Sequence, residues 1–156
     1  MSFEEHPTPP KEQKDLDQAI QALVPAARLH LARGDYDLAG AMARRGMRVI
    51  GADRVRAVEL LTILVDTELG RGDLDAALAA CAELTDRTAE LDIAPLQARV
   101  GTTRARAQAA TGALSDAVAT LEATVDLVDP GKLPWLRANL QLDLARLHER
   151  SGDRVA

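Results

Sequence analysis

The stretch Leu69-Gly-Arg-Gly-Asp-Leu-Asp-Ala-Ala-Leu-Ala-Ala80 predicts a corner between two helices. Gly72 can adopt the left-handed backbone conformation that ends a helix, because it has no side chain to clash there. Asp73 or Asp75 can then accept the free backbone N–H groups that open the next helix. Small residues follow and let two helices approach closely: Ala76, Ala77 and Ala80. The stretch therefore predicts a helical hairpin.

The same corner recurs along the chain. Gly34 and Gly112 stand in similar contexts, and Arg150-Ser-Gly152-Asp153 repeats part of the pattern. The four corner glycines are 38, 40 and 40 residues apart. Repetition at this period, with two helices in each unit, is typical of an α-solenoid. We therefore expect an all-α fold of about seven helices, arranged as antiparallel helical hairpins.

Composition supports the all-α class. Hydrophobic residues make up 47% of the chain, yet only three residues are aromatic: Phe3, Tyr36 and Trp135. A sheet would favour β-branched and aromatic side chains, whereas the abundance of Ala and Leu favours helices.

Charge and targeting signals limit the partners. A formal net charge of −5 argues against direct binding of nucleic acid, because such proteins usually carry a clustered basic face. No apolar run is long enough to span a membrane, and the first residues do not resemble a signal peptide, so the chain is predicted to be cytoplasmic. Cys81 is the only cysteine, which excludes an intrachain disulfide and favours a small buried side chain over a reactive thiol.

The chain divides into a short leader and one repeat domain. Residues 1–11 are rich in proline and are predicted to be a disordered leader, followed by a helical domain over 12–156. Hairpins are expected over about 15–51, 52–92 and 93–130, with a single last helix over 133–150. Pro25 should kink or divide the first helix. Ser115 and Asp116 are the predicted caps of the sixth helix.

These units resemble the tetratricopeptide repeat over about residues 16–153. Three features carry the resemblance: Gly-Asp at the corner, an alanine five residues after the corner glycine (Ala39, Ala77, Ala117), and Pro130 at the end of a repeat. The resemblance implies a right-handed α-solenoid whose concave face binds a protein or peptide. The units exceed the basic repeat length of 34 residues. In that respect they look like the repeat regions of large bacterial transcription regulators of the maltose-activator and LuxR type, so a signal-sensing segment of such a regulator is the alternative function.

No catalytic, cofactor or metal site is predicted, and we do not expect an enzyme. Gly70-Arg-Gly72 lacks the preceding strand, third glycine and Lys-Ser/Thr pair of a phosphate-binding loop. His30 and His148 each lie four residues before a corner glycine, in different units, so they should not share a site.

A concave face would be lined by one stripe of the first helix in each hairpin. Counting back from each corner glycine in steps that stay on one face gives mostly polar residues. The predicted partner-binding residues are Arg28, Glu59, Thr62, Asp66, Arg99, Thr102, Arg106, Asn139 and Arg146. The arginines could bind the carboxylates of a partner, or they could form solvated salt bridges with acidic residues of adjacent helices.

The last helix predicts a second surface. Its leucine seam should pack on the preceding hairpin: Leu133, Leu136, Leu140, Leu144 and Leu147. Trp135 and Leu142 lie on a different side, and an uncovered apolar surface of this kind can drive self-association. We therefore expect either a homodimer through this helix or a further helix, from a longer protein, that covers it.

Overall fold

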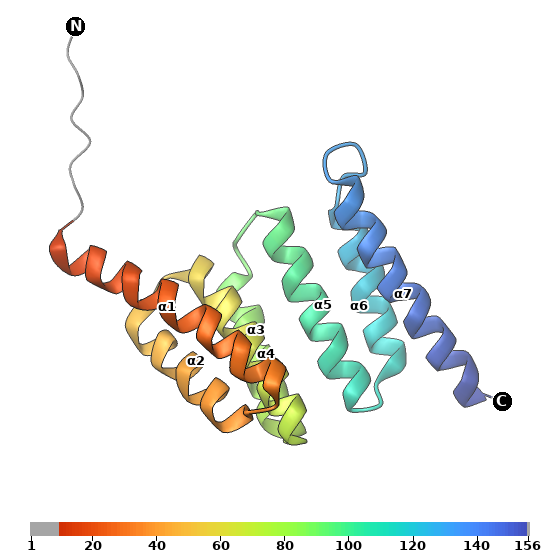
Figure 1. Ribbon diagram of the computed structural model, residues 1–156. Helices are drawn as coiled ribbons and strands as arrows, with labels where there is room; N and C mark the ends of the chain where they lie inside the picture. Colours follow the sequence, from red (N-terminus) through yellow and green to blue (C-terminus); the bar gives the residue numbers. More distant parts are fainter. Residues whose placement is uncertain (1–9, 156) are drawn as a thin grey trace, which may run out of the picture.

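The computed structural model describes the backbone of residues 10–155 and the side chains of residues 10–152. This part of the chain is all-helical and has no strands. Figure 1 shows its seven helices: α1 (Lys11–Arg33), α2 (Tyr36–Ile50), α3 (Arg54–Arg71), α4 (Leu74–Thr88), α5 (Ala94–Ala110), α6 (Leu114–Leu127) and α7 (Pro134–Val155). None of these helices is both long and apolar enough to cross a membrane.

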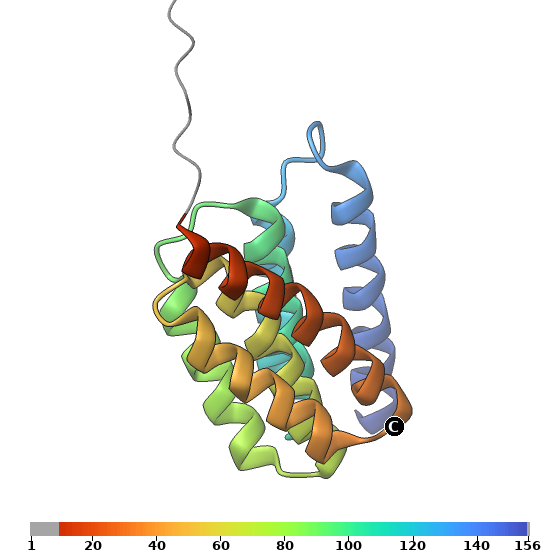
Figure 2. The ribbon, with the colours of Figure 1, turned by 60° about the vertical axis from the view of Figure 1, so that its left-hand side comes forward.

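Consecutive helices pack against one another in chain order (Figures 1 and 2). In addition, each odd-numbered helix contacts the next odd-numbered one: α1 with α3, α3 with α5, and α5 with α7. Within the described residues, no even-numbered helix contacts another even-numbered helix. We call the exposed side of α1, α3, α5 and α7 the odd-helix face. It carries the stripe that the sequence predicted as partner-binding.

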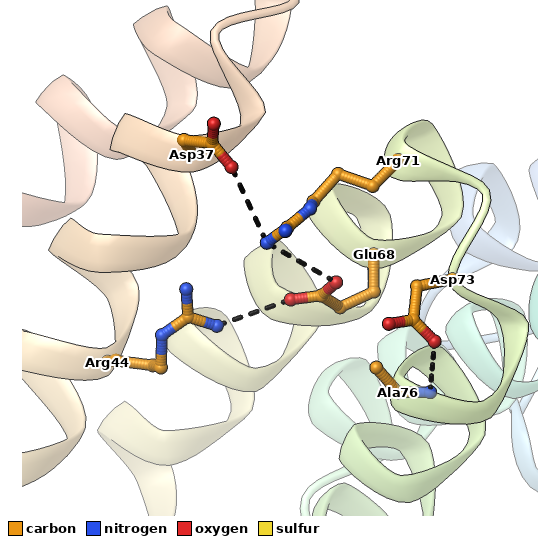
Figure 3. Close-up of polar contacts among 6 residues, drawn as sticks. All are labelled: Asp37, Arg44, Glu68, Arg71, Asp73 and Ala76. Atoms are coloured by element: carbon orange, nitrogen blue, oxygen red, sulfur yellow. Dashed lines mark hydrogen bonds and ion pairs between the residues drawn. The ribbon is translucent and has the colours of Figure 1, made fainter.

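Three corner glycines have the predicted conformation. Gly34, Gly72 and Gly112 have φ angles of +80°, +76° and +88°, in the left-handed region. After Gly72, the Asp73 carboxylate accepts a hydrogen bond from the backbone N–H of Ala76 at 3.0 Å, which Figure 3 shows. The sequence left Asp73 and Asp75 as alternatives, and the structure assigns this cap to Asp73.

The fourth predicted corner is wrong. Gly152 lies inside α7, which continues to Val155 instead of ending near Arg150. A glycine in a helix interior costs only about 1 kcal/mol relative to alanine, so it does not by itself end a helix. An aspartate follows Gly152, as it follows Gly34 and Gly72, so the Gly-Asp pair alone does not make a corner.

Three smaller expectations about helix ends and breaks also need correction. The predicted caps Ser115 and Asp116 lie within the first turn of α6, whose N-cap is Ala113. Of the two effects expected of Pro25, division of the first helix is wrong, because α1 continues through it; Pro25 is exposed, and so is Gln21, whose carbonyl loses its helical donor and can be hydrated. The predicted leader lies outside the described residues except for its last two, where Lys11 already begins α1.

Small residues bring the helices close together. The alanines that follow each corner by five residues, Ala39, Ala77 and Ala117, are at most 1% exposed. Gly101 of α5 packs directly on Thr124 of α6: a Cβ atom at Gly101 would lie 2.0 Å from Thr124 Oγ1. The buried core is accordingly distributed along the chain. One cluster joins α1 to α5, and another joins α5, α6 and the leucine seam of α7, as predicted for that seam.

Side chains of α5 and α7 donate hydrogen bonds to backbone carbonyls at the end of the preceding helix. Gln97 of α5 donates from Nε2 to the carbonyls of Thr88 and Leu91, at 2.8 and 2.5 Å, at the end of α4. Arg137 of α7 donates from Nη1 to the carbonyls of Val125 and Val128, at 2.9 and 3.0 Å, at the end of α6. Thr88 and Val125 also accept the backbone N–H groups of Leu91 and Val128, at 3.0 and 3.1 Å, so the side-chain donors add a second hydrogen bond at these helix ends.

A buried carboxylate fixes α2 on α3. Glu68 of α3 is only 6% exposed, and Arg44 of α2 donates to it from Nη1 at 3.2 Å. Arg71 lies 3.8 Å from the other Glu68 oxygen and 3.6 Å from Asp37, as Figure 3 shows. The two guanidinium groups offset the cost of burying one negative charge at this interface.

Candidate binding groove between α5 and α7

The predicted stripe is held together by ion pairs between neighbouring odd-numbered helices. Glu59 of α3 pairs with Arg28 of α1, and Arg99 of α5 lies 4.0 Å from the same Glu59 oxygen. Each of these side chains is more than one third exposed. These three residues thus form solvated ion pairs between neighbouring helices, which the sequence analysis gave as one of two alternatives.

A second pair joins α3 to α5. Arg106 Nη2 lies 3.1 Å from Asp66 Oδ1. Burial raises the pKa of Asp66, and the neighbouring Arg106 guanidinium lowers it by less, so the net shift is upward. Asp66 is thus a partly dehydrated carboxylate at the base of the odd-helix face.

Five of the nine predicted residues line one hollow. Thr62, Arg99, Thr102, Arg106 and Asn139 surround a cavity of about 350 Å³ between α3, α5 and α7. Trp135, which the sequence assigned to a separate interface, lines the same hollow and is 62% exposed. The structure therefore places Trp135 of the predicted interface in the same hollow as five residues of the predicted partner-binding stripe. Leu142, the other half, is 50% exposed and lines neither this hollow nor the next.

A second hollow of about 490 Å³ extends the first toward the other end of α5 and α7. The two hollows share Thr102, Arg106 and Asp143, so they form one continuous depression, which we call the α5–α7 groove. Its floor is apolar and is made by Ala98, Ala105, Ala109, Leu121, Leu140 and Leu147. In Figure 1, α6 appears between α5 and α7 and partly behind α7; α5 and α7 also contact each other, and α6 supplies Leu121 to the floor.

The groove exists because α5 has small side chains on the side facing α7. Ala98, Thr102, Ala105 and Ala109 follow steps of four, three and four residues, which keeps them on one side of a helix. Larger side chains at these positions would fill the space between α5 and α7. The spacing was visible in the sequence, but it could be read equally well as close helix packing.

Charged residues at the rim of the groove are mostly basic. Arg99, Arg106, Arg146 and Arg150 line it, with Asp143 as the only lining acid among the described residues. Arg146 pairs with Asp143 of its own helix at 3.4 Å. Asp143 and Arg150 were not predicted as site residues, because counting from the corner glycines selects a narrower stripe than the groove occupies.

Groups with catalytic or metal-binding potential do not converge. Within the described residues, no three His, Cys, Asp or Glu side chains are placed to hold a metal ion. His30 Nδ1 lies 3.3 Å from the Asp35 carboxylate, while His148 is exposed on α7. Cys81 is buried as predicted, and burial raises the pKa of its thiol, which disfavours the reactive thiolate.

Comparison with known proteins does not identify this chain: no family model, no curated protein and no solved structure matches it.

Proposed function

We propose that this protein is a non-catalytic scaffold module of tetratricopeptide type that binds a protein or peptide through its odd-helix face. The observation that carries this proposal is the α5–α7 groove, because it is a long depression with an apolar floor and polar rim on the predicted stripe. Recognition sites for peptides commonly combine these two features.

The contacts between helices support a solenoid whose concave side is the odd-helix face. Odd-numbered helices contact one another in succession, whereas even-numbered helices do not, so the layer of odd-numbered helices is the tighter one. A stack with one tight and one loose layer curves toward the tight layer. The odd-helix face is then the concave face of the right-handed solenoid that the sequence resemblance implies.

The salt bridges on this face suit it to binding. Exposed ion pairs contribute under about 1 kcal/mol each to stability, so their partners can be exchanged at low cost. Arg28, Glu59 and Arg99 are all exposed enough to turn toward an incoming peptide.

Selection from a random peptide library tests this function. Peptides would be selected on the wild-type chain and then tested on Arg28→Phe, Thr62→Phe and Asn139→Phe, which obstruct the odd-helix face on α1, α3 and α7. Ala79→Phe and Ala119→Phe, at exposed positions of α4 and α6, are matched controls. We expect selected peptides to lose binding to at least one odd-face variant and to keep binding to both controls. Failure to select any peptide with this dependence would refute the proposed function.

A further inference from the structure

We propose that the α5–α7 groove binds an acidic amphipathic helix of the partner, with the helix lying along the groove. This inference rests on the proposed binding function and specifies its site and the chemistry of its ligand.

The shape of the groove fits a helix. It runs from Pro95 and Trp135 at one end to Ala110 and Arg150 at the other. Those residues are 15 positions apart on each helix, which corresponds to about 22 Å or about four turns at 1.5 Å per residue. Both walls are helices that run in the same direction in Figure 1 and contact each other, so a third helix can lie over the depression between them with one apolar stripe facing the floor.

The floor selects apolar side chains. Alanines of α5 and leucines of α6 and α7 line it, and Ala105, Leu121 and Leu147 are each at most 8% exposed. The floor therefore offers shallow apolar depressions instead of hydrogen-bonding groups. A ligand helix with apolar residues at steps of three and four would pack those side chains against the floor.

The rim selects acidic flanks. Arginines stand on both walls, Arg99 and Arg106 on α5 and Arg146 and Arg150 on α7, against the single acid Asp143. Arg99 reaches Glu59 only at 4.0 Å, and no described carboxylate forms an ion pair with Arg150. Guanidinium groups bind carboxylates in a bidentate manner, so Arg99 and Arg150 suit acidic side chains on a ligand. This basic rim contrasts with the net charge of −5 of the whole chain.

Selection from a second library tests this inference. Its members are 18-residue helical peptides whose apolar stripe is drawn from Ala, Leu, Met and Phe and whose flanking positions are drawn from Glu, Gln and Lys. After selection on the wild-type chain, the most enriched peptide is synthesised and titrated against the purified chain. Binding is followed by the fluorescence of Trp135, the only tryptophan, which lines the groove.

Matched variants locate the site. Thr102→Phe obstructs the middle of the groove at a half-exposed position, and Ala119→Phe adds the same side chain on exposed α6. Arg99→Gln with Arg150→Gln removes two rim charges, and Arg45→Gln with Arg48→Gln removes two exposed charges of α2. Circular dichroism and thermal melting confirm folding of each variant.

We expect Glu to be enriched at the flanking positions and Thr102→Phe to lose binding. The Arg99/Arg150 variant should bind the peptide about fivefold more weakly, or worse. Both control variants should bind it as the wild type does. Enrichment of Lys or Gln, absence of any enrichment, or unchanged binding to Thr102→Phe would overturn the inference. Random peptides that depend on Arg28 but on none of Thr62, Thr102 and Asn139 would overturn it too, while leaving the proposed function intact.

Discussion

Arg106 of α5 and Asp66 of α3 form an ion pair across two helices, with Nη2 and Oδ1 3.1 Å apart. The pair lies beside the groove, and burial raises the pKa of Asp66 more than Arg106 lowers it. The folded chain therefore holds a proton on Asp66 more tightly than the unfolded chain does. Ionised Asp66 is a net cost to folding, despite its partner.

This relationship predicts a pH-dependent effect of Asp66→Asn. The pKa of Asp66 is higher in the folded chain than in the unfolded chain, so protonated Asp66 favours folding. This contribution to stability is complete below the unfolded-state pKa. It is lost as the pH rises through the folded-state pKa. The variant should therefore gain stability relative to wild type as the pH rises through and above the ordinary aspartate range. Urea unfolding at several pH values measures this, with exposed Asp116→Asn as the control. A relative loss of stability with rising pH would contradict the upward shift.

Glu68→Gln should destabilise the α2–α3 interface. The substitution removes the charge that pairs with Arg44 and Arg71 while keeping the shape of the side chain. A buried hydrogen-bonded charge of this kind contributes about 1 to 3 kcal/mol to the free energy of unfolding. Glu83→Gln, which removes one half-exposed pair with Arg87 within α4, should cost under about 0.5 kcal/mol. Equal costs for the two variants, measured by chemical unfolding, would contradict the role of Glu68.

Gly152→Ala distinguishes a helical interior from a corner. In α7 this glycine has a helical environment, and no atom outside its immediate surroundings lies within 4 Å of a Cβ built there. Alanine should stabilise the chain by up to about 1 kcal/mol. Gly72→Ala should instead destabilise it by about 1 to 2 kcal/mol, because φ is +76° there. Thermal melting of both variants checks this, and destabilisation by Gly152→Ala would restore the corner that the sequence predicted.

Ala77→Leu should overpack the second hairpin. Ala77 is 1% exposed, so three additional carbon atoms have no space without movement of α3 or α4. We expect a loss of about 1 to 3 kcal/mol. Ala79→Leu, two residues further along α4 at an exposed position, is the matched control and should leave the melting temperature almost unchanged.

Leu142→Glu tests self-association through α7 without altering the groove. Leu142 is 50% exposed and lines no hollow described above, whereas Trp135 belongs to both the predicted interface and the groove. If the chain dimerises through this surface, a charge at Leu142 should dissociate the dimer. Sedimentation velocity over a concentration series gives the answer: a dimer that persists in the variant would exclude this surface.

Local signals in the sequence predicted the helices well, because they act within a few residues. The second helix begins at Tyr36 and ends at Ile50, within the hairpin predicted over about 15–51, because Gly34 and Gly51 bound it. The error at Gly152 shows the limit of such signals, because a helix can contain a glycine at a cost of only about 1 kcal/mol. The exposed positions of Trp135 and Leu142 were also predicted correctly.

The groove could not be predicted in the same way. Its width depends on how far α7 lies from α5, and that distance is set by packing of both helices on α6. The small residues on α5 are compatible with either a tight contact or a hollow. The sequence therefore located residues such as Thr102 and Asn139 on the correct face but did not show that a depression joins them to Trp135 and Arg150.

The donors that close α4 and α6 determine where this chain could be divided and recombined. Gln97 and Arg137 each come from the helix after the loop, so a cut between α4 and α5 or between α6 and α7 separates a donor from its carbonyls. A cut at Gly72 or Gly112 keeps each donor with its acceptors. These two donors therefore favour joining duplications or grafts at the corner glycines, whereas Arg87 of α4, which donates to the carbonyl of Gly51 at the end of α2, ties α4 to the helix pair before it.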